Sequence, residues 1–567
     1  MNTDNKIIYD TIIIGSGPGG LSAAICLARA GQKVLVLEQH YVPGGWCHNF
    51  TINGQRFCPG VHYIGNVQKG ESTAKLYEGL GIANDLAFFR MNKNAYEHCY
   101  IGTEKIDMPA TAENLYQSLA QRFPAEKNGL KKYISLIEKV GVQLELVPKL
   151  KTVKDYLLAP YKLRHLLKYL PFSLKTVIGW HIKDPLLRDV LNTQCGDHAL
   201  PPAKASFVLQ CAIMSHYFNG AYYPAGAGGA IIKAMTNAIK KYGSQVKTEH
   251  PVARILVEGT KTKKAVGVEL ANGIQLFAKN IISNADPEKT FRQMIGEKNL
   301  SKNLISKLNK TQYSISCLIL FLTVDMDVRK FGVDSGNIWL SQKIDIDKQH
   351  EAMMKIDLLS DDEFPGMFIS CSTLKDPVSY NGTYHNFEIV TFIDSKLFEE
   401  FTGTYNYQSP KYKDYKHRAC QKFLRSLEKI MPGISNHIVQ MELGTPKTNN
   451  FYINCTKGNI YGTKKTLNQL IGPLAYQQKT EIKNLYLCGA STLAHGATGA
   501  SFSGVKTASH ILNCSEDDLL AANPNQNIRI YDAEDSSTWP QWVHNKINDK
   551  KNRFKQPLAP GSLLQAV

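Results

Sequence analysis

The sequence predicts an α/β protein with more than one domain, and three observations lead to this fold class. The stretch Ile7–Ile14 is short, rich in β-branched residues and closed by glycine, as expected for a buried parallel strand. After a glycine-rich turn, the small residues of Leu21–Ala30 predict a helix packed closely on a sheet, and Lys33–Leu37 predicts a second strand. The length of 567 residues exceeds what one hydrophobic core commonly holds.

The turn between the first strand and the helix has the spacing of a dinucleotide-binding site. In Gly15-Ser-Gly-Pro-Gly-Gly20, the G-x-G-x-x-G glycines are Gly15, Gly17 and Gly20. They permit a tight turn, close approach of the backbone to a pyrophosphate and close packing of helix on strand. The helix N-terminus offers N–H groups and a positive dipole end to the phosphates. Glu38, after the second strand, can accept ribose hydroxyls, and its charge disfavours a 2′-phosphate and therefore NADP at this position.

Composition limits the classes of partner. The net charge of +17 and the pI near 9.1 favour anionic partners. No nucleic-acid-binding module is recognised, so we expect no nucleic-acid partner. The 12 cysteines form no C-x-x-C pair and no metal-ligand spacing, which predicts reduced thiols in a reducing compartment and no metal. No signal peptide and no apolar run of about 20 residues is seen, so we expect a cytoplasmic protein with at most peripheral membrane contact.

Two further glycine-containing segments distinguish between the possible dinucleotides. Pro43-Gly44-Gly45-Trp-Cys-His48 and Pro59-Gly60-Val-His-Tyr63-Ile-Gly65 follow the first unit. A Gly-Gly pair in this place lets the chain run along a long cofactor. This layout resembles the flavoprotein superfamily of phytoene desaturases, carotenoid cis–trans isomerases and amine oxidases. Within it, the two segments look most like those of the retinol saturases.

The resemblance continues discontinuously over about residues 7–512. The segments that carry it follow in family order: Tyr223–Gly229, Val252–Ile255, Ala265–Val268, Ile281–Asp286, Thr445–Pro446, Gly458–Gly462 and Asn484–Gly489. It implies a discontinuous Rossmann-like FAD-binding domain built from residues 1–75, 222–292 and 445–514. An inserted α+β substrate domain would comprise residues 76–221 and 293–444. Residues 515–567 match nothing in the family and are expected to form a C-terminal tail, for docking or as a lid.

The resemblance also implies the residues that hold FAD. The ADP half would lie on Gly15, Ser16, Gly17, Pro18, Gly19, Gly20, Glu38 and Gln39, with Val252 at the adenine. The rest of the cofactor would lie along Gly44, Gly45, Gly60, Val61, His62, Gly489, Ser491, Gly499 and Ala500. The family usually has an aspartate where this chain has Ser491. The helix that starts near Thr498 would point its N-terminus at the flavin, where positive potential stabilises the reduced form.

The implied activity is hydride transfer between flavin N5 and a C=C system of an apolar polyene or isoprenoid lipid. His62, Tyr63 and His48 are candidates for moving the accompanying proton, although each can equally be a structural residue. Alternatives are a redox-neutral carotenoid isomerase, a non-catalytic lipid carrier of the Rab dissociation inhibitor type, or an amine oxidase. No second dinucleotide fingerprint is seen, because Gly226–Gly229 reads as a turn before a helix, so the electron partner stays unidentified.

The stretch Lys149–Lys175 combines positive charge with apolar side chains. It contains seven basic residues against one acidic residue, interleaved with leucines and aromatic residues. Such a pattern fits a helix lying on an anionic membrane surface, or alternatively a substrate-domain helix with a solvated basic face. Membrane docking would suit an enzyme that takes a lipid substrate from a bilayer.

Overall fold

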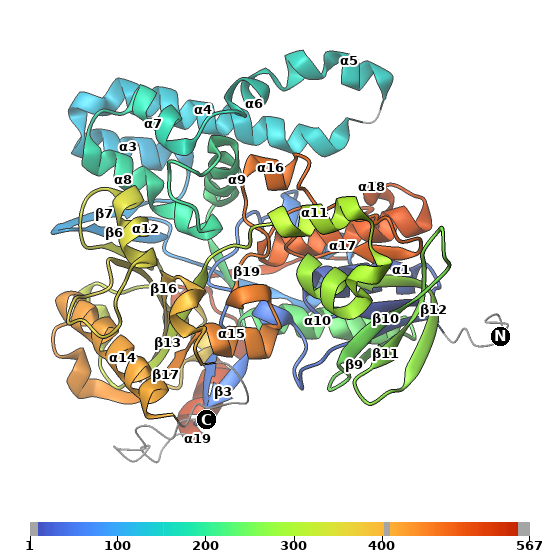
Figure 1. Cartoon of the computed structure of the whole chain (residues 1–567). Helices are drawn as coiled ribbons and strands as arrows, with labels where there is room; N and C mark the ends of the chain where they lie inside the picture. The colour runs from blue at the N-terminus through green and yellow to red at the C-terminus, as the bar shows by residue number, and fades with distance from the viewer. Residues whose placement is uncertain (1–8, 151, 402–408, 554–567) are drawn as a thin grey trace.

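A computed structural model describes residues 9–150, 152–401 and 409–553 of the chain. Two seven-stranded sheets lie side by side, and a layer of helices covers one end of the molecule (Figure 1). The predicted α/β fold class is confirmed. Of the predicted first strand, Ile7 and Ile8 lie outside the described residues, and β1 spans Tyr9–Ile14.

The first sheet contains the strands of the strand–helix–strand unit predicted from the sequence. Its strands lie in the order β10 (Val252–Glu258), β11 (Lys264–Leu270), β12 (Gln275–Ser283), β1, β2 (Val34–Leu37) and β9 (Gln245–Lys247), and β18 (Leu485–Leu487) pairs with β12. β1 runs parallel to both of its neighbours, β12 and β2. Residues 12–14 of β1 and the whole of β2 are buried, as their β-branched and leucine side chains predict. The parallel strands β1, β12 and β18 come from three distant parts of the chain. Their carboxyl ends therefore lie at the same edge of the sheet.

Two helices pack closely beside this sheet. α1 (Pro18–Arg29) is buried through Ala28, and it lies against α17 (Gly496–Leu512). A Cβ atom added at Gly504 of α17 would lie 2.0 Å from the carbonyl oxygen of Gly19. The two backbones can approach this closely only because position 504 has no side chain.

The second sheet joins strands from both of the inserted segments. Its order is β17 (Ile438–Gly444), β13 (Ser316–Val324), β16 (His385–Ile393), β15 (Gly366–Cys371), β14 (Asn337–Ser341), β6 (Glu97–Ile101) and β7 (Glu104–Met108). All of β13 is buried, and Leu320 and Leu322 share a core with Phe423 and Leu427 of α14 (Pro410–Ile430). One face of the sheet therefore packs on a long helix.

A layer of helices closes one end of the second sheet. Its main members are α3 (Ala112–Arg122), α4 (Lys127–Leu146), α7 (Leu174–His181), α8 (Pro185–Asn192) and α9 (Phe207–Tyr217). They share one core, in which Leu130, Ile137, Val177, Val190 and Phe207 are each at most 1% exposed. α10 (Gly228–Lys241) begins in the Gly226–Gly229 run, so that run is a helix start, as predicted.

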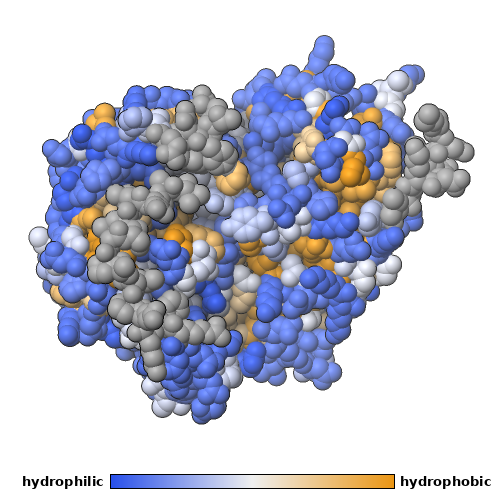
Figure 2. Space-filling view, turned by 90° about the horizontal axis from the view of Figure 1, so that it is seen from below, coloured by the Kyte–Doolittle hydropathy of each residue, from blue (hydrophilic) through white to orange (hydrophobic). Residues whose placement is uncertain are grey.

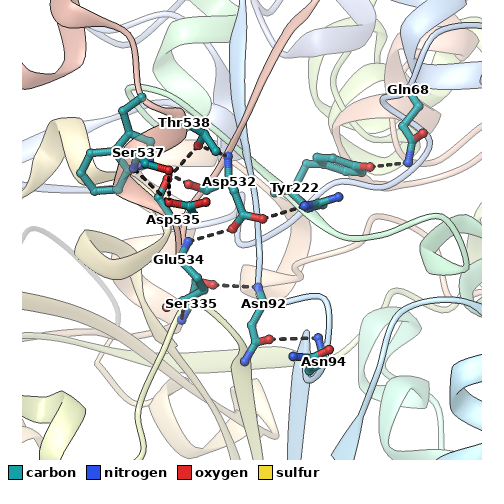
Figure 3. Close-up of polar contacts among 12 residues, drawn as sticks. Gln68, Asn92, Asn94, Tyr222, Ser335, Asp532, Glu534, Asp535, Ser537 and Thr538 are labelled. Atoms are coloured by element: carbon teal, nitrogen blue, oxygen red, sulfur yellow. Dashed lines mark hydrogen bonds and ion pairs between the residues drawn. The ribbon is translucent and has the colours of Figure 1, made fainter.

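The C-terminal segment, as far as residue 553, is not a separate tail. β19 (Arg529–Asp532) pairs in parallel with β5 (Ala87–Arg90), and α19 (Gln541–Arg553) buries Val543 and Ile547 against Phe89. Asp532 forms a 2.6 Å ion pair with Arg90, and Glu534 accepts a hydrogen bond from the backbone N–H of Ser335 (Figure 3). The polar sequence concealed this docking because most of the contacts come from scattered side chains and backbone groups.

The basic stretch is not a single helix. It contains two short helices, α5 (Val153–Lys162) and α6 (Arg164–Tyr169), which meet at Leu163, and it ends in the first turn of α7. Leu163 and Leu166 are buried in the helical core, whereas α5 buries no residue and projects from the layer (Figure 1). Lys151 lies outside the described residues. The sequence did not reveal this division because both helices carry the same basic and apolar residue types.

Figure 2 shows the face of the molecule that lies away from the helical layer. Seen from below, it is mostly hydrophilic, with hydrophobic residues in separate patches (Figure 2). Within the described ranges, no helix is both long and apolar enough to cross a bilayer.

Ile547→Ala is expected to weaken the docking of the C-terminal segment by about 2–5 kcal/mol, because it leaves a cavity beside Phe89. Amide hydrogen exchange over residues 529–553 measures this change. Asn548→Ala, an exposed position on the same helix, is the matched control. Equal protection in both variants would contradict the packing described.

Candidate active site

A cavity lies where the first sheet faces the second. It begins at the glycine-rich turn after β1 and continues between the two sheets. Its lining includes Gly17, Pro18, Gly19, Gly45, Cys47, Gly60, His62, Tyr63, Asp197, Asn284, Cys317, Ile319, Trp339, Phe368, Val390, Phe392, Tyr461, Gly489, Ser491, Gly496, Ala497 and Ala500. The lining residues come from distant segments of the chain, and the carboxyl ends of parallel strands are the usual place for such a site.

The floor of the cavity is a contact between three loops. Asn284 follows β12, and its side chain lies against the glycine-rich turn and against Gly489, which follows β18. Added Cβ atoms would lie 2.6 Å from Asn284 Nδ2 at Gly17 and 2.8 Å from Asn284 Oδ1 at Gly19. An added Cβ at Gly19 would also lie 2.9 Å from the backbone nitrogen of Gly489. The glycines therefore serve the packing of these loops as well as the approach of a ligand.

Ser16 links the other parts of the predicted ADP site. Its hydroxyl donates to Glu38 Oε2 at 2.5 Å and accepts the N–H of Gly44 at 3.0 Å. The backbone N–H of His250 donates to the Glu38 carbonyl, which brings the start of β10, and with it Val252, toward the end of β2. Glu38, Gly44 and Val252 are thus held near one another, although none of them lines the cavity itself.

The N-termini of α1 and α17 both border the cavity, and neither has a side-chain cap. Their first N–H groups and their positive dipole ends therefore face this space. There they would stabilise the negative charge of a phosphate or of a reduced flavin. This arrangement, together with the glycine cradle, fits a dinucleotide cofactor. α17 begins at Gly496, two residues before the predicted start.

The predicted cofactor residues fall into two groups. Those that line the cavity are Gly17, Pro18, Gly19, Gly45, Gly60, His62, Gly489, Ser491 and Ala500. Those that lie behind or beside it are Gly15, Ser16, Gly20, Glu38, Gln39, Gly44, Val61, Val252 and Gly499. Ser491 is buried, and its hydroxyl accepts the N–H of Thr463 at 3.3 Å, so it also tethers a neighbouring loop.

The end of the cavity away from the glycine turn is apolar and aromatic. Trp339 and Phe368 stand edge to face, with ring centroids 4.7 Å apart. Ile319, Val390 and Phe392 of the second sheet line the same region. Such a surface suits a hydrophobic ligand held against the cofactor.

The three histidine and tyrosine candidates occupy different environments. His48 is buried outside the cavity, and its Nδ1 lies 2.7 Å from the Gly45 carbonyl, which is a structural contact. His62 lines the cavity beside Phe368, and burial lowers the pKa of His62 to about 3, so this imidazole is neutral. Tyr63 lines the cavity and contacts two carboxyl groups, Glu97 and Asp197, which the sequence did not indicate.

Other site residues also escaped prediction. Lys465 is buried and contacts the carbonyl of Ala490, and burial lowers the pKa of Lys465 to about 7. Trp339, Phe368 and Asp197 reach the cavity only through the tertiary fold. Among these residues only Asn284 could have been predicted from the sequence, because it directly follows the strand in a segment that resembles the family.

Comparisons with known proteins agree with this geometry. Residues 13–80 match the family model of an NAD(P)-binding Rossmann-like domain. The chain is 29% identical over 533 residues to an all-trans-retinol 13,14-reductase of Danio rerio, covering 89% of this chain and 86% of that protein. It is 28% identical over 531 residues to a chloroplastic prolycopene isomerase of an Oncidium hybrid, covering 89% and 84%.

Solved structures show the same fold. An oxidoreductase from Methanosarcina mazei matches with a TM-score of 0.58 at 16% identity, over 88% of this chain and 99% of that one. Cyclohexylamine oxidase from Brevibacterium oxydans matches with a TM-score of 0.56 at 16% identity, over 89% and 99%. The Rossmann-like match and the glycine-lined cavity together fit a dinucleotide cofactor of the flavin type. In sequence, the chain is similar along most of its length to the two relatives named above, a retinol reductase and a carotenoid isomerase.

Gly17→Ala is expected to lower the affinity for the flavin cofactor about tenfold or more, because the new methyl group would displace Asn284 and obstruct the pyrophosphate. Flavin content after purification and the Kd of reconstitution measure this effect. Gly179→Ala in α7, which has no neighbouring atom within 4 Å of the added Cβ, is the control. Full flavin content in the Gly17 variant would argue against this cradle.

Proposed function

We propose that the chain is an FAD-dependent oxidoreductase that acts on C=C bonds of an apolar polyene or isoprenoid lipid. The observation that carries this proposal is the continuity of the cavity. One end has the glycine turn and two uncapped helix N-termini, and the other end has an apolar wall. A polyene in the apolar end would therefore lie against a flavin held at the glycine end.

FAD is the cofactor that we assign to the glycine end. Gly17, Gly19 and the N-terminus of α1 would hold the pyrophosphate, and Glu38 would accept the adenosine ribose hydroxyls. Gly489 and the start of α17 would border the ribityl chain and the flavin ring. When bound, the flavin supplies hydride donation or acceptance at N5. The protein positions the alkene, excludes water and supplies the proton.

Two other functions stay open as alternatives. A redox-neutral carotenoid isomerase would use the same cavity, and the prolycopene isomerase relatives favour keeping this possibility. A non-catalytic lipid carrier is a second alternative, because a Rab GDI from Plasmodium falciparum has a similar fold, with a TM-score of 0.50 at 12% identity. That degree of likeness concerns the fold only.

The purified protein is expected to be yellow and to release FAD on denaturation. Anaerobic mixing of the reduced protein with all-trans-retinol or a carotene should reoxidise the flavin and give a product two hydrogens heavier. Absorbance and mass spectrometry follow both changes. Unchanged product mass with altered double-bond geometry would establish the isomerase instead. A colourless protein that cannot be reconstituted with FAD would favour the non-catalytic lipid carrier.

We propose further that α5 docks the enzyme on an anionic membrane. Its side chains Val153, Tyr156, Leu157 and Tyr161 are between 62% and 78% exposed. Exposed Lys149, Lys154, Arg164 and Lys168 flank them, whereas Lys162 and Lys175 pair with Asp155 and Asp347. Apolar side chains for the acyl region, with lysines at headgroup level, are the features of an interfacial helix.

Replacing Leu157 and Tyr161 together with serine is expected to weaken binding to anionic liposomes about tenfold or more. The reason is that each large apolar side chain contributes about 1.5–3 kcal/mol when buried. Flotation with anionic and neutral vesicles measures binding. The matched control replaces Ile274 and Ile471, which are 53% and 66% exposed on other surfaces. Equal flotation of the two variants would reject docking through α5.

A further inference from the structure

Two carboxyl groups and one phenol meet at the apolar end of the cavity. The Tyr63 hydroxyl lies 2.7 Å from Glu97 Oε1 and 2.7 Å from Asp197 Oδ2. Glu97 comes from β6, whereas Asp197 comes from a short helical segment, Thr193–His198, in the helical layer. Tyr63 and Asp197 both line the cavity. The ring of Tyr63 is held in place by Tyr217, whose parallel ring lies at a centroid distance of 4.3 Å.

These distances require a shared proton. A phenol carries one hydrogen, so Tyr63 can donate to only one of the two carboxyl groups. The other contact is a hydrogen bond only if that carboxyl group is protonated and donates to the phenol oxygen. The Trp339 indole N–H donates to Glu97 Oε1 at 2.9 Å, so Glu97 Oε1 receives two donors and is best satisfied as a carboxylate. The proton therefore resides on Asp197.

The surroundings keep Asp197 protonated at neutral pH. Burial, and next the charge of Glu97, raise the pKa of Asp197 to about 8, while burial raises the pKa of Glu97 to about 7. Glu97 is fully buried, and its second oxygen, Oε2, has no hydrogen-bond partner among the described residues. An ionised pair at this spot would place two charges in an apolar pocket, so the two acids retain one proton between them.

The other titratable groups around Asp197 do not compensate a negative charge there. Those that face it are Tyr63, Tyr96, Glu97, Cys195, Tyr217 and Tyr461. His495 Nε2 lies 2.7 Å from the backbone carbonyl of Asp197, and burial lowers the pKa of His495 to about 3, so it is neutral. Lys375 is buried and donates to the His62 carbonyl. The positive charge of Lys375 lowers the pKa of Glu97 and so favours the ionised form of that carboxyl group.

We propose that Asp197 is the proton donor of C=C saturation, with Tyr63 and Glu97 as positioning residues. This inference rests on the proposed function. Saturation adds a hydride, which carries both electrons from the reduced flavin, to one alkene carbon, and a proton to the other. The O–H bond of Asp197 breaks as the new C–H bond forms. The resulting Asp197 carboxylate regains a proton from water before the next turnover.

The direct test is Asp197→Asn in the reconstituted holoprotein. The variant is expected to retain FAD and the wild-type Tm but to saturate the polyene about 10²–10⁴-fold more slowly, which is the usual contribution of a general acid. The wild-type rate should fall as pH rises through about 8, because the acid form is the reactive one. That limb should be absent in the variant, and Asp197→Glu should restore part of the rate. Asp189→Asn, a buried carboxylate outside the cavity, is the matched control.

A second measurement does not depend on turnover. The infrared difference between the wild type and Asp197→Asn should contain a protonated-carboxyl band that disappears between about pH 6 and about pH 10. Glu388, whose pKa burial also raises to about 8, is present in both proteins and cancels in this difference. Absence of that band from the difference would overturn the proposal, as would saturation by the variant within about threefold of the wild-type rate. If the wild type binds FAD but saturates no polyene, the proposed function fails, while the infrared band still decides whether Asp197 stores a proton.

Discussion

The contact of the glycine-rich turn with Asn284 and Gly489 is the constraint on which the site depends. It brings the loops after β1, β12 and β18 to within van der Waals distance, and a single methyl group at Gly19 would collide with both of the other loops. The close packing of α1 on α17 at Gly504 is part of the same contact. Because these backbones meet without side chains between them, two helix N-termini can border one cavity.

Charge is distributed in opposite ways at the two ends of this cavity. At the glycine end, backbone N–H groups and helix dipoles favour negative charge without an arginine or lysine among the lining residues. At the apolar end, Glu97 and Asp197 add negative charge where burial makes it costly, and a retained proton relieves that cost. The cavity is thus suited to an anionic cofactor at one end and to acid chemistry at the other.

The fold class and the glycine turn could be predicted because their signals are local in sequence. Gly15, Gly17, Gly20 and Glu38 lie within one strand–helix–strand unit, and their spacing alone indicates a dinucleotide. Asp197 could not be found in this way, because it is 134 positions from Tyr63 and joins it only when the helical layer packs on the second sheet. The sequence did not predict the break between α5 and α6 or the short, polar β19. Both features depend on tertiary contacts, which the local sequence does not specify.

The strands of the first sheet come from distant parts of the chain, and this has a consequence for biosynthesis. β1 leaves the ribosome early, but β18 and α17, which complete the cradle, are made much later. Until then the glycine turn has no Gly489 beside it. The edge of β12 that pairs with β18 is also unpaired. The cradle is therefore complete only in a nearly full-length chain. Such long-range pairing slows folding and leaves apolar strands exposed to association with other nascent chains.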